Sequence, residues 1–248
     1  MPTLLFAGTA SGYASARKNS SCIVYSADDT NILIDCGDGA TRALIQQNFD
    51  PNSLDALIIT HMHPDHSGGL MFLIQTLHLL RRERPFQLFI PSETSRFIEY
   101  SLHHHYLFHD TLGFNLQISP IKSGETFQIG GIDLLARPNR HMSIHSDVMS
   151  KHENLLGEAF SLDIRYDGTR LVYTSDILDY PDLNAIACGG GEVLVTETAH
   201  IEFESIIEVV QKYPFDKVVI THVPQEKEKE PLPDDRFIRA TDGCVVIF

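Results

Sequence analysis

The sequence lacks any apolar run of membrane-spanning length and contains few cysteines. No stretch approaches the roughly 20 apolar residues of a membrane helix, and the stretch Leu4 to Ala7 is too short for a signal-peptide core. Because the cysteines show no C-x-x-C spacing, neither a disulfide framework nor a thiolate zinc site is indicated. We therefore expect a cytoplasmic protein with reduced, mostly buried thiols and no membrane partner. The cysteines are Cys22, Cys36, Cys188 and Cys244.

Positive charge is also scarce. Lys and Arg total 19 against 33 Asp and Glu, which gives a formal charge of −14. A surface of this charge repels the phosphates of nucleic acid, which disfavours a generic nucleic-acid binder. Arg81, Arg82 and Arg84 form a local basic cluster, interpreted either as a solvated helix end or as a contact for an anionic ligand. The glycine clusters have neither dinucleotide-binding nor P-loop spacing.

The apolar pattern predicts strands that alternate with helices, which is typical of a layered α/β fold. The chain length and its 43% hydrophobic content suit one domain over residues 1–248. Helices are expected over Ala40 to Phe49, Gly69 to Arg82, part of Thr94 to Phe108, and Ile201 to Tyr213. Strands are expected over Leu4 to Ala7, Cys22 to Tyr25, Ile32 to Asp35, Ala56 to Thr60, Leu88 to Ile90, Ile132 to Ala136, Phe160 to Ile164, Leu171 to Thr174, Val193 to Thr196, Lys217 to Thr221 and Cys244 to Phe248.

Two of these strands resemble each other in register. Residues 54–61 and 215–222 are each an apolar run that ends in Thr and His. Two further strands end in aspartate, at Asp35 and Asp176. Polar groups that can bind metal thus collect at strand ends in both halves of the chain, which indicates one site assembled between two similar halves.

The strongest functional motif follows a predicted strand directly. In Thr60-His61-Met62-His63-Pro64-Asp65-His66, three imidazoles and a carboxylate fall within six positions. In extended backbone His61 and His63 project to the same side, and the turn at Pro64 redirects Asp65 and His66. Two pairs of ligands could therefore face two neighbouring metal ions. Imidazole and carboxylate suit zinc at about 2.0 to 2.2 Å, with two such ions about 3.5 to 4 Å apart.

This motif resembles the H-x-H-x-D-H signature of the metallo-β-lactamase superfamily. The segments Phe6 to Thr9, Arg17 to Ser21 and Leu33 to Arg42 resemble the opening of ribonuclease Z and its phosphodiesterase relatives. The resemblance covers nearly the whole chain and implies a four-layer αββα sandwich. It also implies a dinuclear, metal-dependent hydrolase in which a metal-bridging hydroxide is the nucleophile.

The resemblance further implies the remaining ligands. Asp176 matches the aspartate that bridges both metals, and His222 matches the last ligand of the second ion. For the mid-chain ligand both His141 and His145 are candidates, and the A-x-P-x-x-H pattern favours His141. The implied metal ligands are His61, His63, Asp65, His66, His141, Asp176 and His222.

Several other polar residues receive expectations. The resemblance implies that Asp35 supports the site through hydrogen bonds, and that Asp65 could also orient the nucleophile. Glu197 matches a ribonuclease Z glutamate, but the later His-Ser-Thr motif of that family is missing here. His200 could replace its histidine as an acid for the leaving group, or could simply precede a helix. The cluster of His103, His104, His105 and His109 is expected to be exposed or structural, with His105 and His109 on one helix face.

The resemblance implies a phosphodiesterase, and the imidazole and carboxylate ligands predict two divalent ions, with zinc expected and manganese or iron as alternatives. The expected substrate is a small phosphodiester or a short nucleic-acid end, and a homodimer is allowed for. The alternatives are hydrolysis of a lactone, thioester or other carbonyl ester, tRNA 3′ processing, di-iron redox chemistry, and an inactive binding module. The last two are disfavoured, because His63 stands where the di-iron branch usually has glutamate and because the ligand set is complete.

Overall fold

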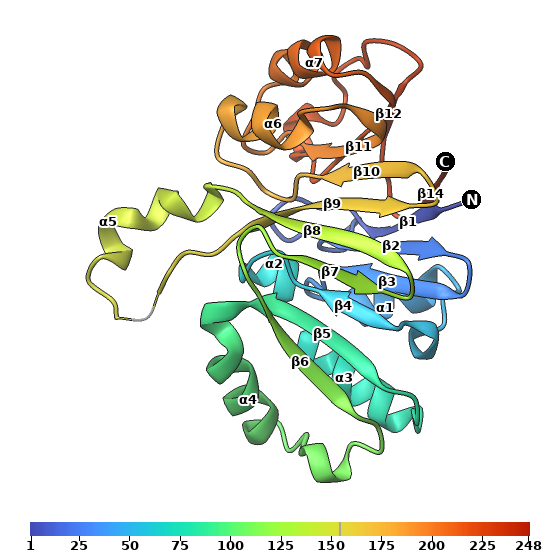
Figure 1. Ribbon diagram of the computed structural model, residues 1–248, viewed down its shortest axis with the longest axis vertical. Helices are drawn as coiled ribbons and strands as arrows, with labels where there is room; N and C mark the ends of the chain where they lie inside the picture. Colours follow the sequence, from blue (N-terminus) through green and yellow to red (C-terminus); the bar gives the residue numbers. More distant parts are fainter. Residues whose placement is uncertain (154) are drawn as a thin grey trace. The chain divides into compact units, whose positions relative to one another are not determined.

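The computed structural model describes residues 1–153 and 155–248, which form two compact units (Figure 1). The first unit comprises Met1–Ile121 and Asp242–Ile247, and the second comprises Lys122–Thr241 with Phe248. Each unit is built on one mixed sheet of seven strands. The expected α/β class is thus confirmed, whereas one domain over 1–248 stays a prediction.

The sheet of the first unit places the end of β3 beside the end of β4. Strands β1 to β3 pair antiparallel, and β3 to β6 pair parallel. Parallel neighbours end at the same edge, so the residues after β3 and β4 are brought together. In sheet order the strands are β14 (Cys244–Ile247), β1 (Thr3–Gly8), β2 (Cys22–Ala27), β3 (Thr30–Ile34), β4 (Ala56–Ile58), β5 (Phe86–Pro91) and β6 (Leu116–Ile121).

Helices of the first unit bury their apolar faces in the core of that unit. In α3, Leu70, Leu73, Ile74 and Leu77 recur at the spacing of one helix face and are all buried. The same core includes Leu44 of α1 and residues of α4. The α-helices are α1 (Ala40–Gln46), α2 (Pro64–Ser67), α3 (Leu70–Leu79) and α4 (Ser95–His104), and the 3₁₀ turns are Pro51–Ser53, Ser92–Thr94 and His109–Thr111.

Arg82, in the middle of the basic cluster, is neither part of a solvated helix end nor exposed to a ligand. Helix α3 ends at Leu79, and the side chain of Arg82 is only 1% exposed. Its guanidinium donates to the backbone carbonyls of Arg84, Asn52 and Pro85. It also lies 5.2 Å from the ring centre of Phe86. Arg82 therefore satisfies loop carbonyls inside the first unit, and burial lowers its pKa to about 10.

The second unit repeats the same pairing pattern. Strands β8 to β10 pair antiparallel, and β10 to β13 pair parallel. In sheet order the strands are β13 (Phe237–Arg239), β12 (Phe215–Thr221), β11 (Gly191–Glu197), β10 (Thr169–Tyr173), β9 (Phe160–Tyr166), β8 (Ile132–Pro138) and β7 (Thr126–Ile129). By strand order β3 corresponds to β10 and β4 to β11. The resemblance between residues 54–61 and 215–222 therefore joins strands that are not equivalent.

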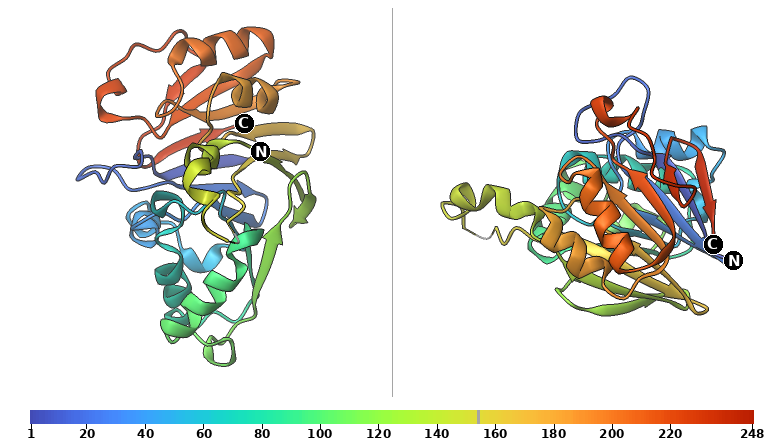
Figure 2. Two further views of the ribbon diagram at one scale, coloured as in Figure 1. Left: turned by 90° about the vertical axis from the view of Figure 1, so that its left-hand side faces the viewer. Right: turned by 90° about the horizontal axis from the view of Figure 1, so that it is seen from above.

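Two helices cover the core of the second unit, and Figures 1 and 2 show them side by side. Asp179 caps the start of helix α6 (Tyr180–Ala187), because its side chain accepts a hydrogen bond from the Asp182 N–H. Pro181 occupies the first turn of this helix. Helix α7 (Phe203–Lys212) buries Phe203, Ile206, Val209 and Val210 against the strands. The shorter turns are 3₁₀ segments at His141–His145 and Gln225–Lys227 and the helix α5 (Ser146–Met149).

The segment between β8 and β9 projects from the rest of the second unit (Figures 1 and 2). It contains α5 and exposes apolar side chains. Ile144 is 53% exposed, Val148 55% and Leu156 67%. Residues 142–158 contain three acidic residues and one lysine, no proline and one glycine. The projection is therefore not basic.

Among the described residues, no helix is long and apolar enough to cross a membrane.

The four cysteines are free thiols. Cys22 and Cys36 are buried, and burial raises the pKa of both thiols, so they stay protonated. Cys188 is exposed and Cys244 is half-buried. The expected burial of the thiols thus holds for two of the four.

Asp163 on β9 gives the second unit a pH-dependent stability. Its carboxylate is fully buried and accepts hydrogen bonds from Arg137 at 3.0 Å, Arg165 at 3.1 Å and Arg170 at 2.8 Å. Burial raises the pKa of Asp163, but the three arginines outweigh this and lower it from 3.8 to about 2. A lowered folded-state pKa stabilises the protein above about pH 4, and this stability is lost as the pH falls toward 2.

We expect Asp163→Asn to lower the free energy of unfolding by about 2 kcal/mol at pH 7 and by about half as much at pH 3. Urea unfolding at both pH values measures the difference. The matched control is Asp234→Asn, which breaks an exposed ion pair with Arg236 and should change stability little. A loss at Asp163 that is the same at pH 7 and pH 3 would contradict the assignment.

Candidate metal centre

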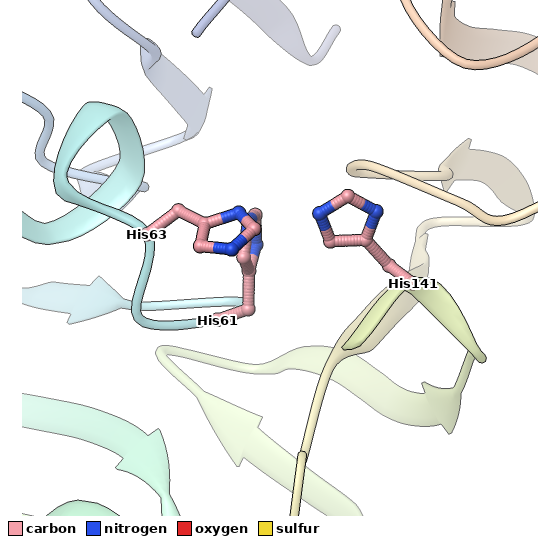
Figure 3. Close-up of side chains that lie close together, drawn as sticks. All are labelled: His61, His63 and His141. Carbon is pink, nitrogen blue, oxygen red and sulfur yellow. The ribbon is translucent and has the colours of Figure 1, made fainter. Parts of the chain in front are cut away.

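The histidine motif leaves the end of β4 in the first unit. His61 is completely buried, and its Nε2 lies 3.2 Å from Nδ1 of His63. Two ligand atoms on one tetrahedral zinc ion at about 2.0 to 2.1 Å lie about 3.4 Å apart. Figure 3 shows the rings of His61 and His63 next to each other, with His141 of the second unit labelled as well. The spacing of the two imidazoles thus suits a shared ion.

Asp35 fixes the orientation of His66 in the same unit. Its Oδ2 lies 2.8 Å from Nδ1 of His66, and its Oδ1 accepts hydrogen bonds from the Thr60 N–H and hydroxyl, each at 2.9 Å. A carboxylate at Nδ1 selects the tautomer that directs the Nε2 lone pair outward. Nε2 of His66 lies 3.6 Å from Oδ2 of Asp65. Asp35 thus makes the hydrogen bonds expected of a residue that orients a ligand, and His66 and Asp65 lie at a separation that suits two ligands of one ion.

In the second unit, histidines surround one carboxylate oxygen. Oδ2 of Asp176 lies 3.4 Å from Nε2 of His222, 3.9 Å from Nε2 of His141 and 3.9 Å from Nδ1 of His200. The two distances of 3.9 Å are too long for hydrogen bonds. Distances of this size suit atoms that bind the same metal ion from different sides. Ligand atoms of His141, Asp176 and His200 lie within 4.8 Å of one another. Imidazole and carboxylate without thiolate form a donor set that fits zinc, manganese or iron.

The two mid-chain candidates differ in their surroundings. His141 is 1% exposed and begins the 3₁₀ turn after β8, and its N–H donates to Oδ1 of Asn139. His145 is exposed at the end of that turn. The surroundings favour His141, and its role as a ligand stays a prediction.

Glu197 orients His200. Glu197 ends β11 and is 1% exposed, and its Oε1 lies 3.1 Å from Nδ1 of His200. Its Oε2 accepts the backbone N–H of His200 at 2.9 Å. The alternative in which His200 merely precedes a helix is weakened, because the residue before α7 is Glu202. The two contacts with Glu197 hold the imidazole of His200 in one orientation.

The backbone adopts the left-handed conformation at three positions near these groups. The φ angles are +59° at Asp35, +53° at Ser175 and +52° at His222. Such a conformation costs a non-glycine residue roughly 1 kcal/mol. The rest of each unit must offset this cost, and in return the side chains after the strands are aimed in directions that extended backbone does not allow.

The loop after β1 approaches Asp65. A Cβ built on Gly12 would lie 3.4 Å from Oδ2 of Asp65, and the neighbouring Tyr13 is 88% exposed. Asp242 anchors this loop through hydrogen bonds from the Thr9 hydroxyl at 2.8 Å and the Asn19 N–H at 2.7 Å. The loop thus has a fixed base and an exposed tip.

The cluster from His103 to His109 is exposed, as expected. Its helical arrangement is different, because α4 ends at His104. His105 lies beyond the helix, where its Nδ1 bonds the carbonyl of Ser101 at 2.7 Å, and His109 lies in a separate turn with a hydrogen bond to Glu99 at 3.1 Å. The expectation that His105 and His109 share one helix face is therefore wrong.

Sequence reasoning missed two polar residues next to the candidate ligands. Asn139 donates from Nδ2 to Ser161 Oγ at 3.1 Å and accepts from the N–H of His141. Asp182 in α6 accepts hydrogen bonds from the N–H groups of Arg140 and Leu178. The sequence places Asn139 beside a histidine, but no local signal links Asp182 to residue 140.

Comparisons with known proteins place the fold. Ribonuclease Z of Archaeoglobus fulgidus is 29% identical over 140 residues, which are 56% of this chain and 44% of that protein. The chain spans about half the length of the curated relatives it matches. The human short-form tRNase Z has a TM-score of 0.77 at 17% identity and covers 99% of this chain and 98% of that one. The metallo-β-lactamase fold protein YhfI of Bacillus subtilis has a TM-score of 0.75 at 17% identity, with the same coverage.

These likenesses confirm the expected metallo-β-lactamase fold. The family model of the anti-Pycsar protein Apyc1 matches residues 2–223, most of the chain. The chain therefore belongs to the family of the anti-Pycsar protein Apyc1.

Proposed function

We propose that the chain is a metal-dependent phosphodiesterase that binds two divalent ions. One observation carries the proposal: in each unit, imidazoles and carboxylates gather after strand ends at separations that suit metal ligands. His61, His63 and His141 would hold one ion. Asp65, His66 and His222 would hold the other, with Asp176 shared by both.

Bound divalent ions would provide a bridging water of lowered pKa as the nucleophile and positive charge for the phosphoryl oxygens. The residues of the chain have their own roles. Asp65, whose side chain is 15% exposed, would orient the attacking water. His200, held by Glu197, would give its proton to the leaving oxygen of the substrate.

The proposed substrates are small phosphodiesters, such as cyclic nucleotides, or a short nucleic-acid end. Relatives named ribonuclease Z support a phosphodiester, and the formal charge of −14 favours a small anion over a long one. A fold by itself does not determine a substrate, so the class rests on these two observations. A homodimer stays a prediction.

A substrate panel tests this proposal. Purified protein loaded with zinc or manganese should hydrolyse bis(p-nitrophenyl) phosphate and cyclic nucleotides, and chelation should remove the activity. Turnover of lactones or thioesters with none of any phosphodiester would replace the proposal with carbonyl ester hydrolysis on the same fold. The absence of turnover with every substrate, in protein that binds no metal, would favour an inactive binding module.

The mid-chain ligand gives a separate prediction. We expect His141→Ala to lower the bound metal from about two equivalents toward one, because it removes a buried imidazole near Asp176. His145→Ala should keep both equivalents, because that side chain is exposed. Elemental analysis of both variants after gel filtration makes the comparison. Loss of metal in His145→Ala alone would show that the two histidines have the opposite roles.

A further inference from the structure

Asp182 joins two loops of the second unit that each carry a proposed ligand. One loop is the turn from Asn139 to His141, which follows β8, and the other runs from Ser175 to Leu178, which follows β10. Asp182 lies in the first turn of α6 and is 8% exposed. Its position between the two loops makes its contacts relevant to both His141 and Asp176.

The carboxylate of Asp182 bonds to both loops at once. Oδ2 accepts the N–H of Arg140 at 3.0 Å and the N–H of Leu178 at 3.2 Å. Oδ1 accepts Nε of Arg140 at 2.9 Å. Arg140 is adjacent to His141, and Leu178 is two residues after Asp176. The carboxylate thus fixes the backbone of one loop to the backbone of the other, one residue and two residues away from the proposed ligands.

Neighbouring contacts hold the carboxylate itself in place. The Asp182 N–H donates to Oδ1 of Asp179 at 3.2 Å, and Asp179 also accepts from the guanidinium of Arg140. A carboxylate in the first turn of a helix is further stabilised by the helix dipole. Asp182 is therefore a rigid point against which both loops are set.

We propose that Asp182 is a positioning residue that holds His141 and Asp176 at the separation an ion requires. The inference rests on the proposed function, because it assigns Asp182 a role toward the same metal site. His141 Nε2 and Asp176 Oδ2 lie 3.9 Å apart, and metal ligands must be placed within about 0.2 Å. Partners of this kind beyond the ligands typically affect metal affinity by about 10 to 100-fold.

The test compares Asp182→Asn with Asp234→Asn. Asp234 also accepts a backbone N–H and a guanidinium, but both come from Arg236, two residues away in the same loop. We expect Asp182→Asn to weaken zinc binding, measured by competition with a chromophoric chelator, by about tenfold or more. Asp234→Asn should bind zinc as the wild type does. In metal-free protein, hydrogen exchange at the Arg140 and Leu178 amides should accelerate in Asp182→Asn only.

A second variant covers the case in which Asp182→Asn does not fold. Asp182→Glu keeps the negative charge at the start of α6 but places its carboxylate one methylene further out, so we expect weaker zinc binding at an unchanged melting temperature. The positioning role alone would be overturned by a folded Asp182 variant in which the Arg140 and Leu178 amides exchange fast but zinc still binds with wild-type affinity. A wild-type protein that binds no zinc would instead overturn the proposed function, and the positioning role with it.

Discussion

Asp176→Ala is expected to reduce phosphodiester turnover by about a thousandfold or more. Asp176 is 3% exposed, and its Oδ2 has nitrogens of three histidines between 3.4 and 3.9 Å away. No other proposed ligand would be shared by both ions, so its removal should affect both. Without the carboxylate, the imidazoles would also lose the negative charge that balances a bound cation.

The measurement combines steady-state kinetics with metal analysis. We expect Asp176→Ala to lose metal and turnover together, and His63→Ala to behave in the same way. The control is His105→Ala, because His105 is exposed and its Nδ1 bonds the carbonyl of Ser101 in α4. A wild-type rate in Asp176→Ala would remove the bridging role, and a loss of turnover in His105→Ala would show that the active site lies elsewhere.

The second large effect concerns substrate size. We expect kcat/KM for a small phosphodiester to exceed that for precursor tRNA by at least about a hundredfold at moderate salt. The projecting segment of the second unit carries Asp147, Glu153 and Glu158 against Lys151. A segment that bound a polyanion would need the opposite charge.

Parallel assays measure this preference. Bis(p-nitrophenyl) phosphate and cyclic nucleotides are compared with 3′-end cleavage of precursor tRNA under identical metal and salt. As a control, Asp147→Lys with Glu153→Lys should raise binding of tRNA without changing the small-substrate rate, because both side chains are exposed on the projecting segment. Efficient, position-specific cleavage of tRNA by the wild type, with poor turnover of small substrates, would assign the chain to tRNA 3′ processing.

The sequence indicates candidate site residues because polar side chains follow buried strands. Asp35, His61 and His222 each come directly or within three residues after an apolar run that is a strand in the structure. Such runs stand out since strands buried on both faces are almost continuously apolar. The links through Asp182 and the pairing of Glu197 with His200 depend on tertiary contacts and local turns that the apolar pattern does not encode.

The expectations fail where tertiary context overrides a local pattern. The Arg82 cluster suggests exposure, yet loop carbonyls bury that guanidinium. Strand β6 was not expected, because Ser119 and Pro120 weaken its apolar pattern, and it lies at the edge of its sheet where proline is tolerated. Helix α6 was also missed, although Asp179 and Pro181 form a readable helix start.

The return of the chain to the first unit sets an order in which the protein can fold during synthesis. The second unit is almost contiguous, so its seven strands are complete by Arg239. The first unit is made earlier, but its sheet is complete only when β14 has been made and pairs with β1. The loop after β1 likewise lacks its hydrogen bonds from Thr9 and Asn19 until Asp242 has been made. On the ribosome, the loop that approaches Asp65 is thus made well before the residues that fix it, so a nascent chain gains this part of its site only after Asp242 and β14 have been made.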